Sequence, residues 1–159
     1  MGSQSKINLA YIAGFLDGDG SLMLQIKKRK DGSSKLRFMP TICFYQDSRH
    51  KEPLSWIRES FGIGYLSDRN DGMTELRING YKRVRDILKS LLPFIKFKKS
   101  QAEALCSAAA ILAQKKLKEF TKSELLNLVE LMILIQNCNY ATKRKKTKEE
   151  LMRILGLTP

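Results

Sequence analysis

The sequence predicts an α+β fold in which β-hairpins alternate with helices and further helices follow. Three observations predict it. The spacing of apolar residues changes from about 3.6 to 2 after residue 20, an Asp-Gly pair interrupts each period-2 region at residues 31–32 and 71–72, and helical spacing returns after residue 93. The expected order is therefore α-β-β-α-β-β-α with additional C-terminal helices.

The first predicted helix covers residues 8–20 and carries apolar or small side chains all round. Such a helix is expected to be buried on more than one face. Four small residues leave its surface low enough for another helix to approach closely: Ala10, Ala13, Gly14 and Gly18. Glycine costs about 1 kcal/mol in a helix interior, so Gly14 is expected to have a packing reason.

The first predicted hairpin covers residues 21–45, where apolar and polar side chains alternate on both sides of the Asp31-Gly32 turn. One face is apolar and the other is mixed and basic. Pro40 lies on the apolar row and indicates a sheet edge or a bulge, because proline has no backbone N–H. The apolar row consists of Leu22, Leu24, Ile26, Leu36, Phe38, Ile42 and Phe44.

Turn and capping residues divide the rest of the chain. Gly62 and Pro93 each follow a helical pattern, and two capping boxes, Thr121-x-x-Glu124 and Thr147-x-x-Glu150, open the last helices. These signals predict helix 51–61, strands 65–69 and 73–78, helices 82–92, 98–116 and 121–137, and a short helix from residue 147 to Gly156.

A chain of 159 residues and 18.2 kDa is long enough to build one core, so residues 1–159 are expected to form a single domain. Its expected parts are a tail or cloning remnant at 1–7, the first helix at 8–20, the sheet with its helices at 21–92, and the C-terminal helices at 93–159.

The charge of the chain indicates a polyanionic partner. Twenty-nine Lys and Arg residues oppose sixteen Asp and Glu residues, which gives a net charge of +13 and a pI near 9.8. Such an imbalance favours phosphate backbones or anionic membranes. No apolar stretch approaches the roughly 20 residues of a membrane span, so we expect nucleic acid and no membrane.

The cysteines and the single histidine exclude some classes of site. Cys43, Cys106 and Cys138 are widely spaced and odd in number, which is typical of reduced thiols in an intracellular protein. With one histidine and no Cys-x-x-Cys pair, a zinc site is not expected. No secretory signal precedes the first helix, so the chain is expected to be intracellular and not secreted.

The most informative segment is Asp17-Gly18-Asp19-Gly20, which places two carboxylates where the first helix ends. Divalent metals need negative charge at one defined point, and here it stands inside a basic chain. The segment is not an EF-hand loop, because position six is Leu22 instead of glycine and position twelve is Lys28 instead of glutamate. The pattern therefore indicates metal-dependent chemistry on nucleic acid.

Residues 12–20, Ile-Ala-Gly-Phe-Leu-Asp-Gly-Asp-Gly, resemble the LAGLIDADG signature of homing endonucleases in its single-motif form. Further family features resemble four other parts of the chain: Gln46, the segment 62–65, the segment 93–98, and Gln101-Ala102. The resemblance therefore covers roughly residues 8–105. It implies that the two hairpins join in one curved, four-stranded antiparallel sheet that binds DNA. It also implies a homodimer, whose helices meet at Ala10, Ala13, Gly14 and Gly18.

The same resemblance implies the roles of the site residues. Asp19 is the expected metal ligand together with the Gly18 carbonyl, whereas Asp17 is expected to satisfy nearby backbone donors. Gln46 is expected to position water and Lys98 to support transition-state charge. The expected ion is Mg²⁺, with Mn²⁺ as a substitute and Ca²⁺ supporting binding without cleavage. One further basic residue near the glutamine is expected among Arg49, His50 and Lys51.

The mixed face of the sheet has the side chains that base readout in a major groove needs, namely amides, guanidiniums, hydroxyls and methyl groups. The densest basic run, residues 142–146, is either a solvated loop or a phosphate contact. The expected DNA-binding residues are Met23, Gln25, Lys27, Arg29, Arg37, Met39, Thr41, Cys43, Tyr45, Ser67, Arg69, Glu75, Arg77, Lys143, Arg144 and Lys145.

The resemblance implies a site-specific endonuclease that is a homodimer and hydrolyses double-stranded DNA with Mg²⁺. The expected target is long and pseudo-palindromic, and the cuts leave short 3′ overhangs. The alternative is a protein that binds nucleic acid without cutting it, such as an RNA-splicing maturase or a DNA-binding regulator, and intron RNA is a further candidate partner. The set Asp19, Gln46 and Lys98 favours the enzyme, because a pure binder does not need it.

Overall fold

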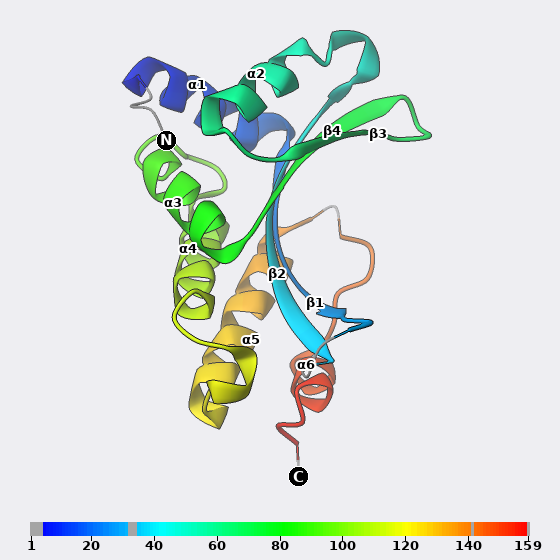
Figure 1. Cartoon of the computed structure of the whole chain (residues 1–159), viewed down its shortest axis with the longest axis vertical. Helices are drawn as coiled ribbons and strands as arrows, with labels where there is room; N and C mark the ends of the chain where they lie inside the picture. The colour runs from blue at the N-terminus through cyan, green and yellow to red at the C-terminus, as the bar shows by residue number, and fades with distance from the viewer. Residues whose placement is uncertain (1–4, 32–34, 141, 159) are drawn as a thin grey trace.

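The computed structural model describes residues 5–31, 35–140 and 142–158, and it shows a curved antiparallel sheet with helices on one face (Figure 1). The first four residues of the expected tail and Gly32 of the first expected turn lie outside this range. The elements are α1 (Lys6–Asp19), β1 (Gly20–Lys28), β2 (Leu36–Asp47), η1 (Ser48–His50), α2 (Glu52–Phe61), β3 (Tyr65–Asp68), β4 (Met73–Asn79), α3 (Tyr81–Leu91), α4 (Lys99–Leu112), η2 (Leu117–Glu119), α5 (Lys122–Cys138) and α6 (Lys148–Ile154).

Both hairpins belong to one four-stranded sheet with the order β1-β2-β4-β3, which confirms the expected α+β fold. β1 pairs with β2 along its whole length, from Gly20 opposite Phe44 to Lys28 opposite Leu36. β4 pairs with β2 only from Thr41 to Asp47, so the first part of β2 extends past β4.

Pro40 lies where β2 passes the end of β4, as its missing N–H predicts. The carbonyl of Phe38, two residues earlier on the same edge of β2, accepts a hydrogen bond from the Tyr81 hydroxyl at 3.0 Å. The backbone of Pro40 therefore turns toward an edge on which β4 no longer offers a partner.

The core lies between the sheet and the helices that cover it. Leu22, Ile42, Phe44 and Leu76 from the apolar rows of three strands are fully buried, together with Leu16 of α1. In a single chain, α1 is buried on one face only, through Ile12, Ala13 and Leu16. The other face of α1 is the one that is expected to meet a second copy of the chain.

Capping explains where the helices begin and end. α1 begins at Lys6, earlier than expected, because the Ser5 side chain caps it by accepting a hydrogen bond from the Asn8 N–H at 3.1 Å. The expected tail at residues 1–7 is therefore too long. Both capping boxes are confirmed, at Thr121 and at Thr147. Gly62 ends α2 in the left-handed conformation at φ 64°.

α4 ends at Leu112 and not at residue 116. The Gln114 N–H bonds to the Ile111 carbonyl at 3.1 Å, which tightens the final turn, and a separate 3₁₀ turn begins at Leu117. All three cysteines are free thiols. Within the described residues, no helix is long and apolar enough to cross a membrane.

Candidate active centre and nucleic-acid interface

The junction between α1 and β1 fixes the position of Asp19. α1 ends at Asp19, and Gly20 begins β1 while its N–H still donates to the Leu16 carbonyl. A Cβ added at Gly20 would lie 2.5 Å from Leu16 Cδ1 and 2.8 Å from the Leu16 carbonyl oxygen. Only glycine allows the chain to leave the helix this closely, so Asp19 is held at one point beside the sheet.

The Asp17 carboxylate joins α1 to the segment that precedes α4. One of its oxygens accepts the N–H groups of Lys96 at 2.7 Å and Phe97 at 3.2 Å, and the other accepts the Lys98 N–H at 3.0 Å. Both oxygens are thus engaged with backbone donors, which is the structural role that the sequence predicted for Asp17.

Asp17→Ala is expected to lower the free energy of unfolding by about 1–3 kcal/mol, because three backbone donors lose their acceptor. Chemical denaturation measures this loss. Asp19→Ala is the matched control two residues away: within the described residues no hydrogen bond or ion pair holds that exposed carboxylate, so its loss is expected to change stability by less than about 0.5 kcal/mol. Equal effects of the two substitutions would contradict the assignment.

Lys98 is the residue that brings positive charge to the end of α1. It stands at the N-terminus of α4, and its ammonium donates to the Asp17 carbonyl. Burial lowers the pKa of Lys98, and the negative charges of Asp17 and Asp19 oppose that shift. The contact with the Asp17 carbonyl therefore holds the Lys98 ammonium at the end of α1.

Gln46 lies at the same end of the sheet. Gly20, next to Asp19, is paired with Phe44, and Gln46 follows two residues later on β2. The Oε1 atom of Gln46 accepts the Asp47 N–H at 2.9 Å. Because this bond engages the carbonyl end of the amide, the NH₂ group is the end left to orient a water or a phosphate oxygen.

Two of the three basic candidates near Gln46 are held by carboxylates. Arg49 donates to both oxygens of Asp47, at 3.0 and 2.8 Å, and these bonds hold the pKa of Asp47 well below its usual range. Lys51 pairs with Asp68 at 3.1 Å. His50, which lies between Arg49 and Lys51, is exposed.

The oxygen donors at the end of α1 fit a magnesium ion whose remaining ligands come from outside the chain. Within the described residues, no three His, Cys, Asp or Glu side chains come together as a metal cluster. Asp19 is a single exposed carboxylate beside the Gly18 carbonyl. Mg²⁺ prefers oxygen ligands, keeps several waters and needs only one or two carboxylates beside phosphate oxygens. Both donors are therefore suited to it.

The polar face of the sheet is built as the alternation predicted. Residues on the outward row of β1 stand opposite outward residues of β2: Gln25 faces Met39 and Lys27 faces Arg37. Tyr45 stands opposite Glu75, which in turn stands opposite Ser67 of β3. All four strands thus contribute side chains to the face that the helices leave uncovered.

Thr41 and Cys43 are corrections to the predicted DNA-binding set, because both are fully buried. They are short side chains in an inner strand, beside the longer Asn79 and Arg77 of β4. Thr41 donates to Asn79 Oδ1 at 2.7 Å, and Cys43 lies 4.0 Å from Glu75. Direct contact of Thr41 or Cys43 with bases therefore does not fit this structure.

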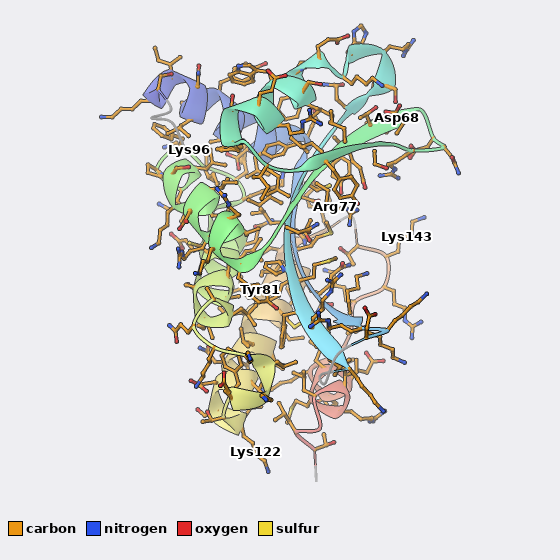
Figure 2. All side chains as sticks on the ribbon, in the orientation of Figure 1. Asp68, Arg77, Tyr81, Lys96, Lys122 and Lys143 are labelled. Atoms are coloured by element: carbon orange, nitrogen blue, oxygen red, sulfur yellow. The ribbon has the colours of Figure 1, made fainter. Side chains whose placement is uncertain are left out.

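Hydrogen bonds and ion pairs order the middle of the polar face. Arg77 pairs with Glu75 at 3.0 Å, and the Tyr45 hydroxyl bonds to Ser21 Oγ at 3.0 Å. Burial raises the pKa of Tyr45 to about 12, so its hydroxyl stays protonated. Figure 2 shows Arg77 near the middle of the molecule, and it stands opposite Cys43 in the pairing of β4 with β2. These contacts fix the side chains before any ligand arrives.

Tyr65 and Asn79 are among the residues of the polar face that were missed from the sequence. Tyr65, 54% exposed, stands opposite Arg77, and Asn79 stands opposite Thr41. Their place on the outward row follows from the pairing of β4 with β2 and β3. The period-2 pattern alone could have found Asn79, which continues the row of Glu75 and Arg77.

The basic loop between α5 and α6 runs beside the free edge of β1. Arg144 and Lys146 line a shallow pocket together with Gln25 and Lys27 of β1. Lys143 lies on the side of the sheet away from α3 and α4 (Figure 2). Lys143, Arg144 and Lys145 are exposed, so their charges extend the polar face beyond its edge strand.

The fold and the site together define a class of α+β proteins. Its members combine an antiparallel sheet that has a polar, basic face with a helix that ends on an exposed carboxylate. The chain belongs to the LAGLIDADG endonuclease family: the model of that family, described as LAGLIDADG endonuclease, matches residues 12–106.

Curated relatives and solved structures agree with this family. The chain is 32% identical to DNA endonuclease I-CvuI of Chlorella vulgaris over 98 residues, which span 62% of this chain and 61% of that protein. It is 28% identical to DNA endonuclease I-CreI of Chlamydomonas reinhardtii over 151 residues, which span 95% of this chain and 90% of that protein.

Two crystal structures of I-CvuI share the whole fold. I-CvuI in complex with its target in the presence of Ca superposes with a TM-score of 0.82 at 26% identity and covers 97% of this chain and 98% of that one. I-CvuI with the I-CreI target in the presence of Mg, its DNA not cleaved, has a TM-score of 0.81 at 27% identity and covers 95% and 96%.

Proposed function

We propose that the chain is a homodimeric, Mg²⁺-dependent endonuclease that cuts both strands of DNA at a long, pseudo-palindromic site and leaves short 3′ overhangs. The observation that carries the proposal is the exposed Asp19 carboxylate at the end of α1, where the Lys98 ammonium donates to the Asp17 carbonyl, at the start of a sheet with a basic face. The DNA-bound relatives support the choice of DNA as the partner.

The need for a dimer follows from the number of carboxylates that are available to bind metal. One chain brings one free carboxylate to the end of α1, whereas two chains related by a dyad bring Asp19 twice. The opposite face of α1 is available for such pairing, since Ala10, Gly14 and Gly18 are exposed on it. Ile7 and Tyr11 of the same face are 81% and 58% exposed, which is a large apolar exposure for a single helix.

Ala13 is a correction to the predicted dimer contacts. Its side chain is fully buried within its own chain, in the core beside Ile12 and Leu16. The proposed interface therefore consists of the exposed residues of α1 alone.

Each site residue has a distinct task in the proposed reaction. Asp19 and the Gly18 carbonyl would hold Mg²⁺, which supplies activation of water and stabilisation of the leaving oxygen when bound. Gln46 orients the water or a phosphate oxygen through its amide NH₂. Lys98 offers an ammonium to the charge that develops on the phosphate, and Asp17 holds the Lys98 backbone in place.

The pH dependence of cleavage tests the role of Lys98. Burial lowers the pKa of its ammonium, so the charged form is lost at a lower pH than for an ordinary lysine. We expect the cleavage rate to fall as the pH rises through that pKa. In Lys98→Arg the fall is expected to disappear, because a guanidinium stays protonated. Single-turnover rates against pH measure this, and an unchanged alkaline fall in Lys98→Arg would contradict the role.

The function itself is tested by selection of bound duplexes. A random duplex library is bound in Ca²⁺, the bound DNA is recovered, Mg²⁺ is added, and every new DNA end is sequenced. Paired ends a few bases apart at the centre of a near-palindrome are expected. Selected binding without Mg²⁺-dependent ends would favour a DNA-binding regulator, and no selection of DNA would favour intron RNA.

A further inference from the structure

A second basic surface lies at the opposite end of β1 from Asp19. It is a cleft of about 1000 Å³ between the end of the β1–β2 hairpin, the first residue of α3, and the connection from α4 to α5. We call it the hairpin cleft. Its lining residues used below are Arg29, Arg37, Tyr81, Lys115, Lys116 and Lys118.

The hairpin cleft exists because β2 is longer than β4. β4 pairs with β2 only from Thr41 onward, so the part of β2 before Thr41 extends past the end of β4. Tyr81 occupies part of that edge by donating to the Phe38 carbonyl, and Pro40 has no N–H to offer. This edge is therefore unsuited to pairing with another strand. The α4–α5 connection lines the space beside this edge, and three of the lining residues are lysines, Lys115, Lys116 and Lys118.

Most of the positive charge in the hairpin cleft is not neutralised within the protein. Lys115 pairs with Glu124 at 2.8 Å. The carboxylate of Glu119, the one acidic residue in the lining, accepts the backbone N–H of Lys116. Within the described residues, no ion pair involves the four remaining cations, which are all exposed: Arg29, Arg37, Lys116 and Lys118.

The four cations come from segments that are far apart in the sequence but form one surface. Arg37 stands opposite Lys27, and Arg29 lies two residues after Lys27, so both arginines continue the outward row of the sheet. Both also line the cleft. The cleft is thus a continuation of the polar face. Exposed cations spread over a wide cleft suit an extended polyanion better than a single small anion, which needs donors converging on one point.

We propose that the hairpin cleft binds the phosphodiester backbone of duplex DNA that flanks the base pairs lying on the sheet, with Lys116 and Lys118 as its phosphate contacts. This proposal rests on the proposed DNA-binding function and extends it to a segment, residues 113–119, that the sheet does not include.

The test compares two duplexes that share one binding site. The first is the shortest selected duplex that the parent protein still binds in Ca²⁺, and the second carries one further helical turn, about 10 base pairs, at each end. The variant Lys116→Gln/Lys118→Gln is compared with Arg83→Gln/Lys89→Gln, which removes two exposed cations from α3 instead. Affinity is measured against salt concentration, and hydroxyl-radical footprinting maps the protected backbone.

The parent protein is expected to bind the long duplex more tightly and to protect its flanks. The cleft variant is expected to lose this gain in affinity and the flank protection. On the long duplex, the slope of its log affinity against log salt concentration is expected to become shallower by about 0.9 per lost phosphate contact. Its affinity for the short duplex and its circular dichroism stay unchanged. Flank protection retained by the cleft variant, or an equal loss in the α3 variant or on the short duplex, would overturn the proposal. Failure of the parent to bind either duplex would instead overturn the proposed function, and this proposal with it.

Discussion

Asp19→Asn is expected to reduce DNA cleavage by at least about 100-fold while DNA binding in Ca²⁺ stays within a few-fold of the parent. The substitution keeps the size and shape of the side chain and removes its charge. Asp19 is exposed, and no hydrogen bond or ion pair holds its carboxylate within the described residues. The loss of charge therefore acts on metal binding and not on the fold.

Three measurements separate this expectation from a structural effect. Denaturation of Asp19→Asn should match the parent, binding should be retained, and cleavage in Mg²⁺ should be lost. Glu103→Gln on the exposed side of α4 removes the same charge away from α1 and is expected to cut normally. If Asp19→Asn cuts DNA at the parent rate, Asp19 is not the metal ligand and the proposed centre is wrong.

The sequence predicted the two rows of the sheet because a period of 2 is a local signal. The role of Asp17 came from the family resemblance, because its partners are not local. The end of a helix leaves carbonyl acceptors, which a carboxylate cannot satisfy. The N–H groups that the Asp17 carboxylate accepts lie about eighty residues away, at Lys96 to Lys98.

The corrections concern residues whose environment depends on distant segments. The alternation in β2 places Thr41 and Cys43 on the outward row correctly, but their burial depends on Arg77, Glu75 and Asn79 of β4. The hairpin cleft was missed for a similar reason. Its residues come from three separate segments, and it exists only because β2 is longer than β4 in the pairing register.

The glycines of α1 were predicted to allow the close approach of a second copy of the helix. A Cβ added at Gly14 or Gly18 would meet no atom within 4 Å in the chain itself. Packing inside one chain therefore explains neither glycine, in contrast to Gly20. An exposed helical glycine that costs about 1 kcal/mol points to a constraint from outside the chain.

Gly14→Leu is expected to prevent dimer formation and with it double-strand cleavage. If two α1 helices meet at Ala10, Gly14 and Gly18, their backbones lie too close for a large side chain. The matched control is Glu103→Leu, which places the same side chain on an exposed site of α4. Sedimentation velocity over a range of concentrations measures the oligomer, and cleavage of the selected target measures the consequence.

Gly14→Ala tests the same interface, because it is expected to change the stability of the monomer and the stability of the dimer in opposite directions. In a chain that stays monomeric, alanine fits the open space at this position and is expected to stabilise the helix by about 0.5–1 kcal/mol. In a close dimer, the same methyl group separates the two helices and weakens association. A variant that is more stable at low concentration but dissociates more readily would therefore support the proposed dimer. A gain in stability with unchanged sedimentation and activity, in Gly14→Ala and Gly14→Leu alike, would show that α1 does not form the interface.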